Sequence, residues 1–198
     1  NFLASHDGIG VRPVEDILTE AQLQALLCAV TDRGGRVSYK KNADGSESPY
    51  ELNINFLDAI SDPGEPDETR AARFLASQAI MLSLQGMPGI YYHSLLGSRN
   101  WQEGVESTGI FRRINREKLP CRTLEEELHR EGTLRNRVFM GYLGLLRARG
   151  GCAAFAPRVP QEILDCGSSV FALRRIPEDG GRPVLVLVNV TGKPVRLA

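Results

Sequence analysis

An apolar run near the start of the chain leads directly into two titratable side chains and a glycine-rich turn. Residues 2–4, Phe-Leu-Ala, are short and apolar enough for a buried strand. His6 and Asp7 follow, and Gly8 and Gly10 then allow the backbone to turn. Ligands bind at the carboxyl ends of strands in barrels and open α/β sheets, so this order predicts a ligand site. The alternative is that His6 and Asp7 only cap a strand and hydrogen-bond the turn.

Three segments in the first half of the chain have patterns that predict secondary structure. Thr19 and Gln22 form a capping box, which predicts a helix that the glycine pair at 34–35 ends. Its apolar stripe must face a sheet or another helix. Residues 50–60 alternate imperfectly and predict a short strand that runs into a helical turn. Residues 67–85 predict a second helix, apolar enough to be buried.

The second half of the chain changes from helical to strand-like periodicity. Thr123 and Glu126 form another capping box, and the helical pattern extends from there to Arg149 with Gly132 as a candidate break. After Cys152, short apolar runs alternate with turn residues, which predicts a small antiparallel β domain. The predicted strands of this domain are residues 170–173, 184–188 and 194–197.

The remaining segments are polar or short. Residues 36–49 and 95–120 are predicted to be long loops, and loops of that length often have a function. Residues 89–92 predict a short strand. His93 and Ser94 would then lie at its carboxyl end, either near a ligand or only fixing the loop that follows.

The overall composition excludes some classes of partner. Hydrophobic residues make up 42% of the 198 residues, enough for one large domain or two small ones. The formal net charge is zero, so nothing favours nucleic acid or an anionic membrane, and a small or neutral ligand is expected. No apolar run is long enough to span a bilayer. The absence of a charged leader argues against secretion, unless the true start lies further upstream.

Cysteine and histidine spacing gives no metal or redox motif. The chain has four cysteines, Cys28, Cys121, Cys152 and Cys166. They lie far apart without a Cys-x-x-Cys pair, so free buried thiols in a reducing cytoplasm are expected. The three histidines are equally scattered. No metal and no cofactor are predicted.

Several motifs together resemble one enzyme superfamily. The first eleven residues resemble the end of the seventh barrel strand in the α-amylase superfamily, glycoside hydrolase family 13, and His6-Asp7-Gly8-Ile9-Gly10 is similar to the sucrose phosphorylase branch in particular. The match continues in the family's order over roughly the first two thirds of the chain. Its further stretches are Tyr50-Glu51-Leu52-Asn53, Met87-Pro88-Gly89-Ile90-Tyr91-Tyr92 and Arg112-Arg113-Ile114-Asn115-Arg116.

The resemblance implies an α/β fold in two parts. Residues 1–150 would be the C-terminal part of a (β/α)8 TIM barrel, namely its last two strand-helix units, with the eighth strand at 89–92. Residues 151–198 would be a small antiparallel β-sandwich, expected to be truncated because the chain stops just after a strand signal. A quarter of a barrel leaves sheet edges uncovered, so the isolated segment is expected to associate or rearrange.

The resemblance also implies the chemistry of a retaining α-glucosyl phosphorylase, which transfers glucose to phosphate and gives glucose 1-phosphate. Its nucleophile and its acid/base carboxyl group come from the fourth and fifth barrel strands, upstream of Asn1, so this segment alone is expected to be inactive. Asp7 would accept hydrogen bonds from the glucosyl 2- and 3-hydroxyls in the oxocarbenium-like transition state, and His6 would donate to the same region.

Four further residues are expected to bind substrate. Similarity to sucrose phosphorylases places Tyr50, followed by Glu51, on a loop that rearranges between acceptor-bound and phosphate-bound states, and Arg112 at an arginine facing the acceptor. Arg12-Pro13 is more similar to sister enzymes acting on sucrose 6'-phosphate, glucosylglycerol or glucosylglycerate. Arg12 would therefore shape the acceptor site and pair with a phosphate or carboxylate group.

Two alternatives stay open. One is a glucoside hydrolase or transglucosylase of the same superfamily, and the other is a non-catalytic carbohydrate-binding or assembly fragment. A cluster of arginines such as 112, 113 and 116 is most often a solvated face, whereas in a sugar enzyme that uses phosphate the planar arginine fork matches a pair of phosphate oxygens. The expected partners are a sugar, inorganic phosphate, the rest of the barrel and, as an option, further copies of the enzyme in a homo-oligomer.

Overall fold

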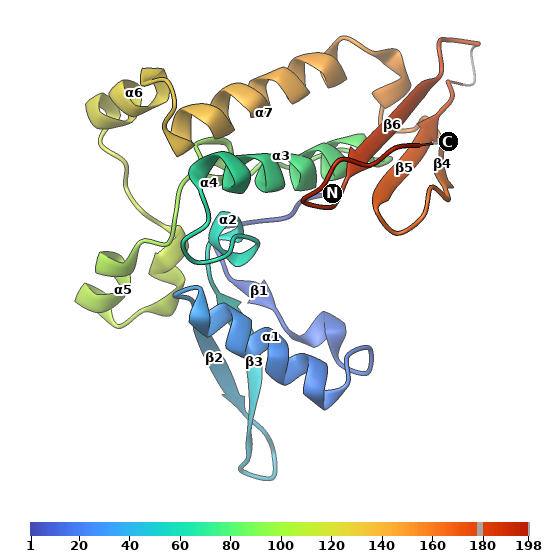
Figure 1. Ribbon diagram of the computed structural model, residues 1–198. Coiled ribbons are helices and arrows are strands. Elements are labelled where there is room, and N and C mark those ends of the chain that lie inside the picture. Colours follow the sequence, from blue (N-terminus) through green and yellow to red (C-terminus); the bar gives the residue numbers. More distant parts are fainter. Residues whose placement is uncertain (178–179, 198) are drawn as a thin grey trace.

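The computed structural model describes residues 1–177 and 180–197 and shows a mixed α/β structure with two separate antiparallel sheets (Figure 1). Two long helices, α3 (Asp67–Ser83) and α7 (Leu134–Gly150), lie side by side. In the view of Figure 1, the N-terminal sheet lies below this helix pair and the C-terminal sheet lies beside one end of it.

The N-terminal sheet contains a hairpin that the sequence did not predict. Its antiparallel strands follow the order β1 (Ile9–Gly10), β3 (Glu47–Asn53) and β2 (Arg36–Lys41). The predicted loop at 36–49 is therefore wrong, because this segment forms β2, a turn and the start of β3. Gly45 in the turn has φ 86°, a value that glycine adopts without strain.

The helix α1 (Glu20–Asp32) packs on this sheet, as its apolar stripe requires. The Thr19 hydroxyl accepts from Gln22 N at 3.3 Å, and the Gln22 side chain accepts from Thr19 N at 2.8 Å, so the predicted capping box is confirmed. A compact apolar core forms between helix and sheet. Its buried members are Val11, Leu27, Val30, Leu52 and Ile54.

The main core lies between α3 and α7. Phe74 and Tyr142 are fully buried there, and the Tyr142 hydroxyl donates to Gln78 Oε1 at 2.8 Å, which satisfies the one polar atom that the ring brings into the core. Gly141 allows close approach, since a Cβ on it would lie 2.3 Å from a methyl carbon of Leu75. The predicted helix at 67–85 is confirmed.

The start of the third predicted helical region differs from the prediction. The helix α6 (Cys121–His129) already begins after Pro120, so Thr123 lies inside it and the capping box predicted from Thr123 and Glu126 is wrong. The predicted break at Gly132 is confirmed, with φ 81°. Thr133 caps α7 instead, by accepting from Asn136 N at 3.2 Å.

Short helices fill the connections. They are η1 (Arg12–Val14), α2 (Phe56–Ala59), α4 (Tyr92–Leu95), α5 (Gln102–Thr108), η2 (Phe111–Asn115) and η3 (Ala153–Phe155). β3 and α2 confirm the predicted strand and helical turn in 50–60. The predicted loop at 95–120 is wrong in part, because it contains α5 and η2.

The C-terminal sheet is a single antiparallel layer rather than a sandwich. Its strands follow the order β4 (Gln161–Leu164), β5 (Val170–Arg175) and β6 (Val184–Asn189). The predicted strands at 170–173 and 184–188 are confirmed, whereas residues 194–197 form no strand and β4 was not predicted.

Arg175 attaches this sheet to the helical part of the molecule. Its side chain is completely buried, and its guanidinium donates to Ser83 O at 2.8 Å, Ala156 O at 2.9 Å and Val159 O at 2.8 Å. Three carbonyl groups from two other segments are thus satisfied by one side chain.

The two predicted barrel strands are not strands in the structure. Residues 2–4 and 89–92 have no strand assignment, and Tyr92 already belongs to α4. The two segments nevertheless lie side by side, because Asn1 N donates to Met87 O at 2.8 Å and Gly89 N donates to Asn1 O at 2.7 Å. Over the described ranges 1–177 and 180–197, no barrel closes.

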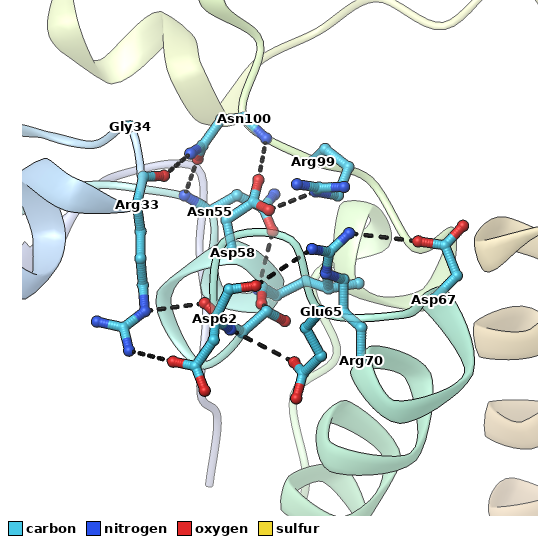
Figure 2. A network of polar contacts seen from close by, with 12 residues as sticks. Arg33, Gly34, Asn55, Asp58, Asp62, Glu65, Asp67, Arg70, Arg99 and Asn100 are labelled. Atoms are coloured by element: carbon cyan, nitrogen blue, oxygen red, sulfur yellow. Dashed lines mark hydrogen bonds and ion pairs between the residues drawn. The ribbon is translucent and has the colours of Figure 1, made fainter.

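A network of polar side chains joins α1, α2 and the segment between α4 and α5 (Figure 2). The buried Asp58 carboxylate accepts from the Arg99 guanidinium and from Asn100 N, the latter at 2.6 Å. The Asn100 side chain accepts from Asn55 N at 2.7 Å and donates to Arg33 O at 3.0 Å. This network fixes the chain that leads into α5.

Cysteine chemistry and membrane spans were also predicted from the sequence. All four thiols are free, as predicted, but Cys28 and Cys121 are exposed, so the prediction that they are buried is wrong. In the described part of the chain, no helix combines the length and the apolar character needed to cross a bilayer.

Candidate functional site

The turn that carries His6 and Asp7 is fastened to β3 directly after these residues. Gly8 N donates to Oε1 of Glu51 at 3.2 Å, and β1 follows. A Cβ at Gly8 would lie 2.5 Å from Leu52 O, so the turn can approach the strand this closely only with glycine. The close packing of Gly8 on β3 therefore holds the His-Asp pair in place.

Two arginines of the η2 region reach the Asp7 carboxylate. Arg116 Nη2 lies 2.9 Å and Arg112 Nη1 lies 3.4 Å from Asp7 Oδ1. Arg116 also donates through Nε to His6 O at 3.0 Å, and His6 Nε2 lies 3.4 Å from Asp7 Oδ2. The predicted residues His6, Asp7 and Arg112 are thus brought together. All these side chains are partly exposed, so solvent weakens each ion pair.

The side chains of the three clustered arginines point in two directions. Arg113 points away from Asp7, and its guanidinium carbon lies 5.5 Å from the centre of the Trp101 ring. Asn115 lies buried between the site and β3, where its side chain donates to Asp7 O at 3.1 Å and to Ile54 O at 3.2 Å. The sequence motif included Asn115, but sequence reasoning gave it no role.

Glu51 lies at the site but is held by protein groups. The residue is buried, and its second carboxylate oxygen, Oε2, accepts from Arg112 Nε at 2.9 Å. This hydrogen bond and the charge of Glu51 raise the pKa of Arg112. Both oxygens of Glu51 therefore already have donors within the chain.

Tyr50 and Arg12 lie on the two sides of the β1–β3 pairing. Tyr50 belongs to β3, so the prediction that it lies on a loop is wrong in this structure. Val11 N donates to Tyr50 O at 3.0 Å, and the Tyr50 side chain is exposed. Arg12 begins η1 with its side chain exposed. Both side chains are accessible to a ligand.

His93 and Ser94 fix a loop, which was the alternative that the sequence left open. His93 is buried, its Nδ1 lies 2.8 Å from Ser98 Oγ, and Ser98 N donates to His93 O at 2.9 Å. Burial lowers the pKa of His93 to about 4. Burial also raises the pKa of Tyr91, whose hydroxyl donates to Asn115 O. Tyr91 thereby supports η2, whereas His93 fixes the loop after α4.

The described residues contain no group of three or more His, Cys, Asp or Glu side chains placed to hold a metal ion. The site is instead made of one exposed carboxylate, two guanidinium groups and an imidazole. Such a set can bind hydroxyl groups and an anion at the same place, because guanidinium forks match the oxygen pairs of phosphate and carboxylate.

Relatives of the chain are phosphorylases that act on glucosides. The chain is 56% identical over 191 residues to glucosylglycerate phosphorylase from Spirochaeta thermophila, covering 96% of this chain and 32% of that protein. It is 43% identical over 196 residues to glucosylglycerate phosphorylase from Allomeiothermus silvanus, covering 98% of this chain and 35% of that protein. No family model matches the chain.

A solved structure agrees in fold. The crystal structure of sucrose 6F-phosphate phosphorylase from Thermoanaerobacter thermosaccharolyticum matches with a TM-score of 0.77 and 24% identity, covering 96% of this chain and 36% of that one. The chain therefore spans about a third of the length of the curated relatives it matches. It is homologous to the glucosylglycerate and sucrose phosphorylases of glycoside hydrolase family 13 and corresponds to a segment of such an enzyme.

Proposed function

We propose that the chain is the C-terminal part of a retaining α-glucosyl phosphorylase that transfers glucose from glucosylglycerate to inorganic phosphate. The observation that carries the proposal is the Asp7 carboxylate, held at a glycine turn with Arg116 Nη2 at 2.9 Å and Arg112 Nη1 at 3.4 Å. The proposal is supported by this arrangement because a carboxylate can accept hydrogen bonds from hydroxyl groups and a guanidinium group can bind phosphate. The preference for glucosylglycerate rests on the 56% identity to a phosphorylase of that name.

We assign residues 1–150 to the catalytic barrel and residues 151–198 to a C-terminal β domain. The hydrogen bonds from Asn1 N to Met87 O and from Gly89 N to Asn1 O follow the pattern of a parallel ladder, as expected of neighbouring barrel strands. Phe2 and Met87 lie on these segments with 69% and 71% of their surface exposed. The rest of the barrel would cover them.

The proposed reaction has two steps. A carboxylate nucleophile from the remainder of the enzyme attacks the anomeric carbon, and a carboxylic acid donates a proton to the departing glycerate oxygen. A phosphate oxygen then attacks the same carbon and displaces the carboxylate, which gives glucose 1-phosphate. Because both of these carboxyl groups belong to other strands, the segment alone is inactive in this proposal.

In this scheme the residues of the chain bind and orient the glucosyl group, phosphate and the glycerate moiety. Asp7 accepts hydrogen bonds from the glucosyl 2- and 3-hydroxyls, which strengthen as positive charge develops on the ring. His6 donates to the same region. Arg112 and Arg116 present guanidinium forks to phosphate. Arg12 pairs with the carboxylate of the glycerate moiety.

Tyr50 completes the acceptor side. Its exposed side chain lies on β3, directly before Glu51 in the sequence. The partners of the complete enzyme are then a glucoside, inorganic phosphate and the rest of its own barrel. The four free thiols support a reducing, cytoplasmic setting.

The proposal is tested with the full-length enzyme that contains this segment. The enzyme is incubated with glucosylglycerate, sucrose, sucrose 6'-phosphate and glucosylglycerol in separate reactions, each with and without phosphate, and glucose 1-phosphate and free glucose are both measured. The expected result is phosphate-dependent release of glucose 1-phosphate, fastest from glucosylglycerate. Equal release of free glucose without phosphate would identify a hydrolase and overturn the proposal.

A further inference from the structure

We propose that Glu51 is a positioning residue that holds Arg112 toward Asp7 and thereby sets the affinity of the site for phosphate. The sequence suggested instead that Glu51 contacts the substrate. The inference rests on the proposed function, because it concerns the phosphate half of that reaction. It assigns Glu51 a role that it exerts through another side chain.

The hydrogen bonds of Glu51 leave it little capacity for a ligand. Its side chain is only 8% exposed, on the central strand of the N-terminal sheet. One carboxylate oxygen accepts from Gly8 N at 3.2 Å and the other accepts from Arg112 Nε at 2.9 Å. A substrate that used Glu51 as an acceptor would have to displace one of these donors.

Arg112 donates to Glu51 through Nε, while its terminal nitrogens face the site. Its Nη1 lies 3.4 Å from Asp7 Oδ1, and 41% of its side chain is exposed. A guanidinium fixed through Nε presents its terminal nitrogens in a defined plane. Such a side chain loses less conformational entropy when phosphate binds than a freely rotating arginine does. The raised pKa of Arg112 agrees with a strong interaction between the two groups.

The same carboxylate also opposes an anion electrostatically. Glu51 and Asp7 carry two negative charges, and Arg112 and Arg116 carry two positive charges, so the four groups sum to zero. If the charge of Glu51 were its main contribution, removing that charge would attract phosphate. If the positioning of Arg112 is the larger effect, removing the Glu51 carboxylate weakens phosphate binding. The two roles therefore predict opposite changes in the KM for phosphate.

The variant Glu51→Gln separates these effects. Glutamine has nearly the same shape, and its amide oxygen can still accept from Gly8 N, so the turn that holds Asp7 stays attached. Its amide nitrogen is a donor and cannot accept from Arg112 Nε. Glu51→Ala removes both contacts and is assayed beside these forms as an additional variant, for which a fall in kcat is also expected because the turn is released.

The experiment uses the full-length enzyme and four forms: wild type, Glu51→Gln, Arg112→Ala and the double variant. Initial rates are measured over a range of phosphate and of glucosylglycerate concentrations. We expect Glu51→Gln to raise the KM for phosphate roughly two- to tenfold while leaving the KM for the glucoside unchanged. In the Arg112→Ala background, the same substitution should have no further effect on the KM for phosphate.

Other outcomes would overturn the inference. A lower or unchanged KM for phosphate in Glu51→Gln would show that positioning does not dominate. An equal effect of Glu51→Gln with and without Arg112 would show that Glu51 does not act through Arg112. A wild-type enzyme that releases glucose without phosphate would refute the proposed function itself, whereas a phosphate-dependent wild type that Glu51→Gln leaves unaltered would refute only the role of Glu51.

Discussion

Asp7 Oδ1 and Arg116 Nη2 lie 2.9 Å apart, although 109 residues separate them along the chain. The contact is one of several that bring η2 against the His-Asp turn, since the Asn115 side chain donates to Asp7 O and Arg116 Nε donates to His6 O. Because β3 holds the other side of the turn through Glu51, the site depends on the packing of two distant segments.

Arg116→Ala should therefore reduce activity more than a typical surface substitution. Hydrogen bonds between charged groups contribute about 1.5–3 kcal/mol, so kcat/KM for phosphorolysis should fall roughly 10- to 150-fold. The matched control is Arg122→Ala, because Arg122 is a fully solvated arginine, with 93% of its side chain exposed, that pairs with Glu126. Equal kcat/KM values for both variants would contradict the placement of Arg116 at the site.

Gly8→Ala should destabilise the turn. The added Cβ would lie 2.5 Å from Leu52 O and 2.7 Å from Glu51 Cγ, so the backbone must shift, at a cost of about 1–3 kcal/mol. The control is Gly144→Ala in α7, where a Cβ meets nothing within 4 Å and alanine favours the helix. Urea unfolding of the full-length enzyme should show a loss for Gly8→Ala and none for Gly144→Ala. The reverse order would show that Gly8 is not tightly packed.

Local signals in the sequence predicted a helix start well where nearby side chains accept hydrogen bonds from the first backbone N–H groups of the helix. Thr19 and Gln22 satisfy each other's backbone donors, so this helix start could be predicted without knowledge of the fold. Thr123 and Glu126 have the same spacing, but the helix already starts after Pro120, and the motif therefore lies inside α6. The spacing alone cannot distinguish these cases.

The β2–β3 hairpin and the contacts that Asn115 and Arg116 make at the site could not be predicted from the sequence in the same way. β2 contains Arg36, Lys40 and Lys41, and its burial pattern gives no clean alternation because the hairpin projects into solvent (Figure 1). The available signals were the alternation of Val37 and Tyr39 with polar neighbours and the turn-rich run Asn-Ala-Asp-Gly-Ser at 42–46. The roles of Asn115 and Arg116 arise only from long-range packing, which no periodicity encodes.

Arg175→Ala should strongly destabilise the attachment of the C-terminal sheet. The substitution removes a buried hydrogen bond to Ser83 O and two partly buried ones to Ala156 O and Val159 O, which should cost about 3 kcal/mol. Its neighbour provides the control, because Arg174 is partly exposed and pairs with Glu162 on the surface, so Arg174→Ala should cost about 0–1 kcal/mol. Similar unfolding midpoints for the two variants would contradict this role of Arg175.

His93 should make stability depend on acid pH. Burial lowers its pKa from 6.5 to about 4, so the unfolded state binds more protons between these two values. The stabilisation is complete above about pH 6.5 and is lost as the pH falls toward 4, with a total of roughly 3 kcal/mol. The partly buried Glu117 has a raised pKa, chiefly because of desolvation, and contributes with the opposite sign, since the folded state favours its protonated form.

The contribution of His93 is isolated by comparing wild type with His93→Gln, which cannot titrate in this range. The free energy of unfolding is measured from pH 4 to 7 for both proteins. The difference in the free energy of unfolding between the two proteins should shrink as the pH falls from 6.5 toward 4, because wild type loses the stabilisation that comes from His93. A difference that stays constant across this range would show that His93 is not held neutral by the fold.

The rate of the full-length Asp7→Asn variant tests the account most directly. Asparagine keeps the size of the side chain but loses the charge that hydroxyl groups and arginines recognise. Glucose 1-phosphate formation from glucosylglycerate is measured at saturating phosphate. Because transition-state hydrogen bonds to the sugar hydroxyls supply several kcal/mol, kcat should fall roughly 10²- to 10⁴-fold while the enzyme stays folded. A kcat equal to that of the wild type would contradict the placement of Asp7 at the glucosyl site.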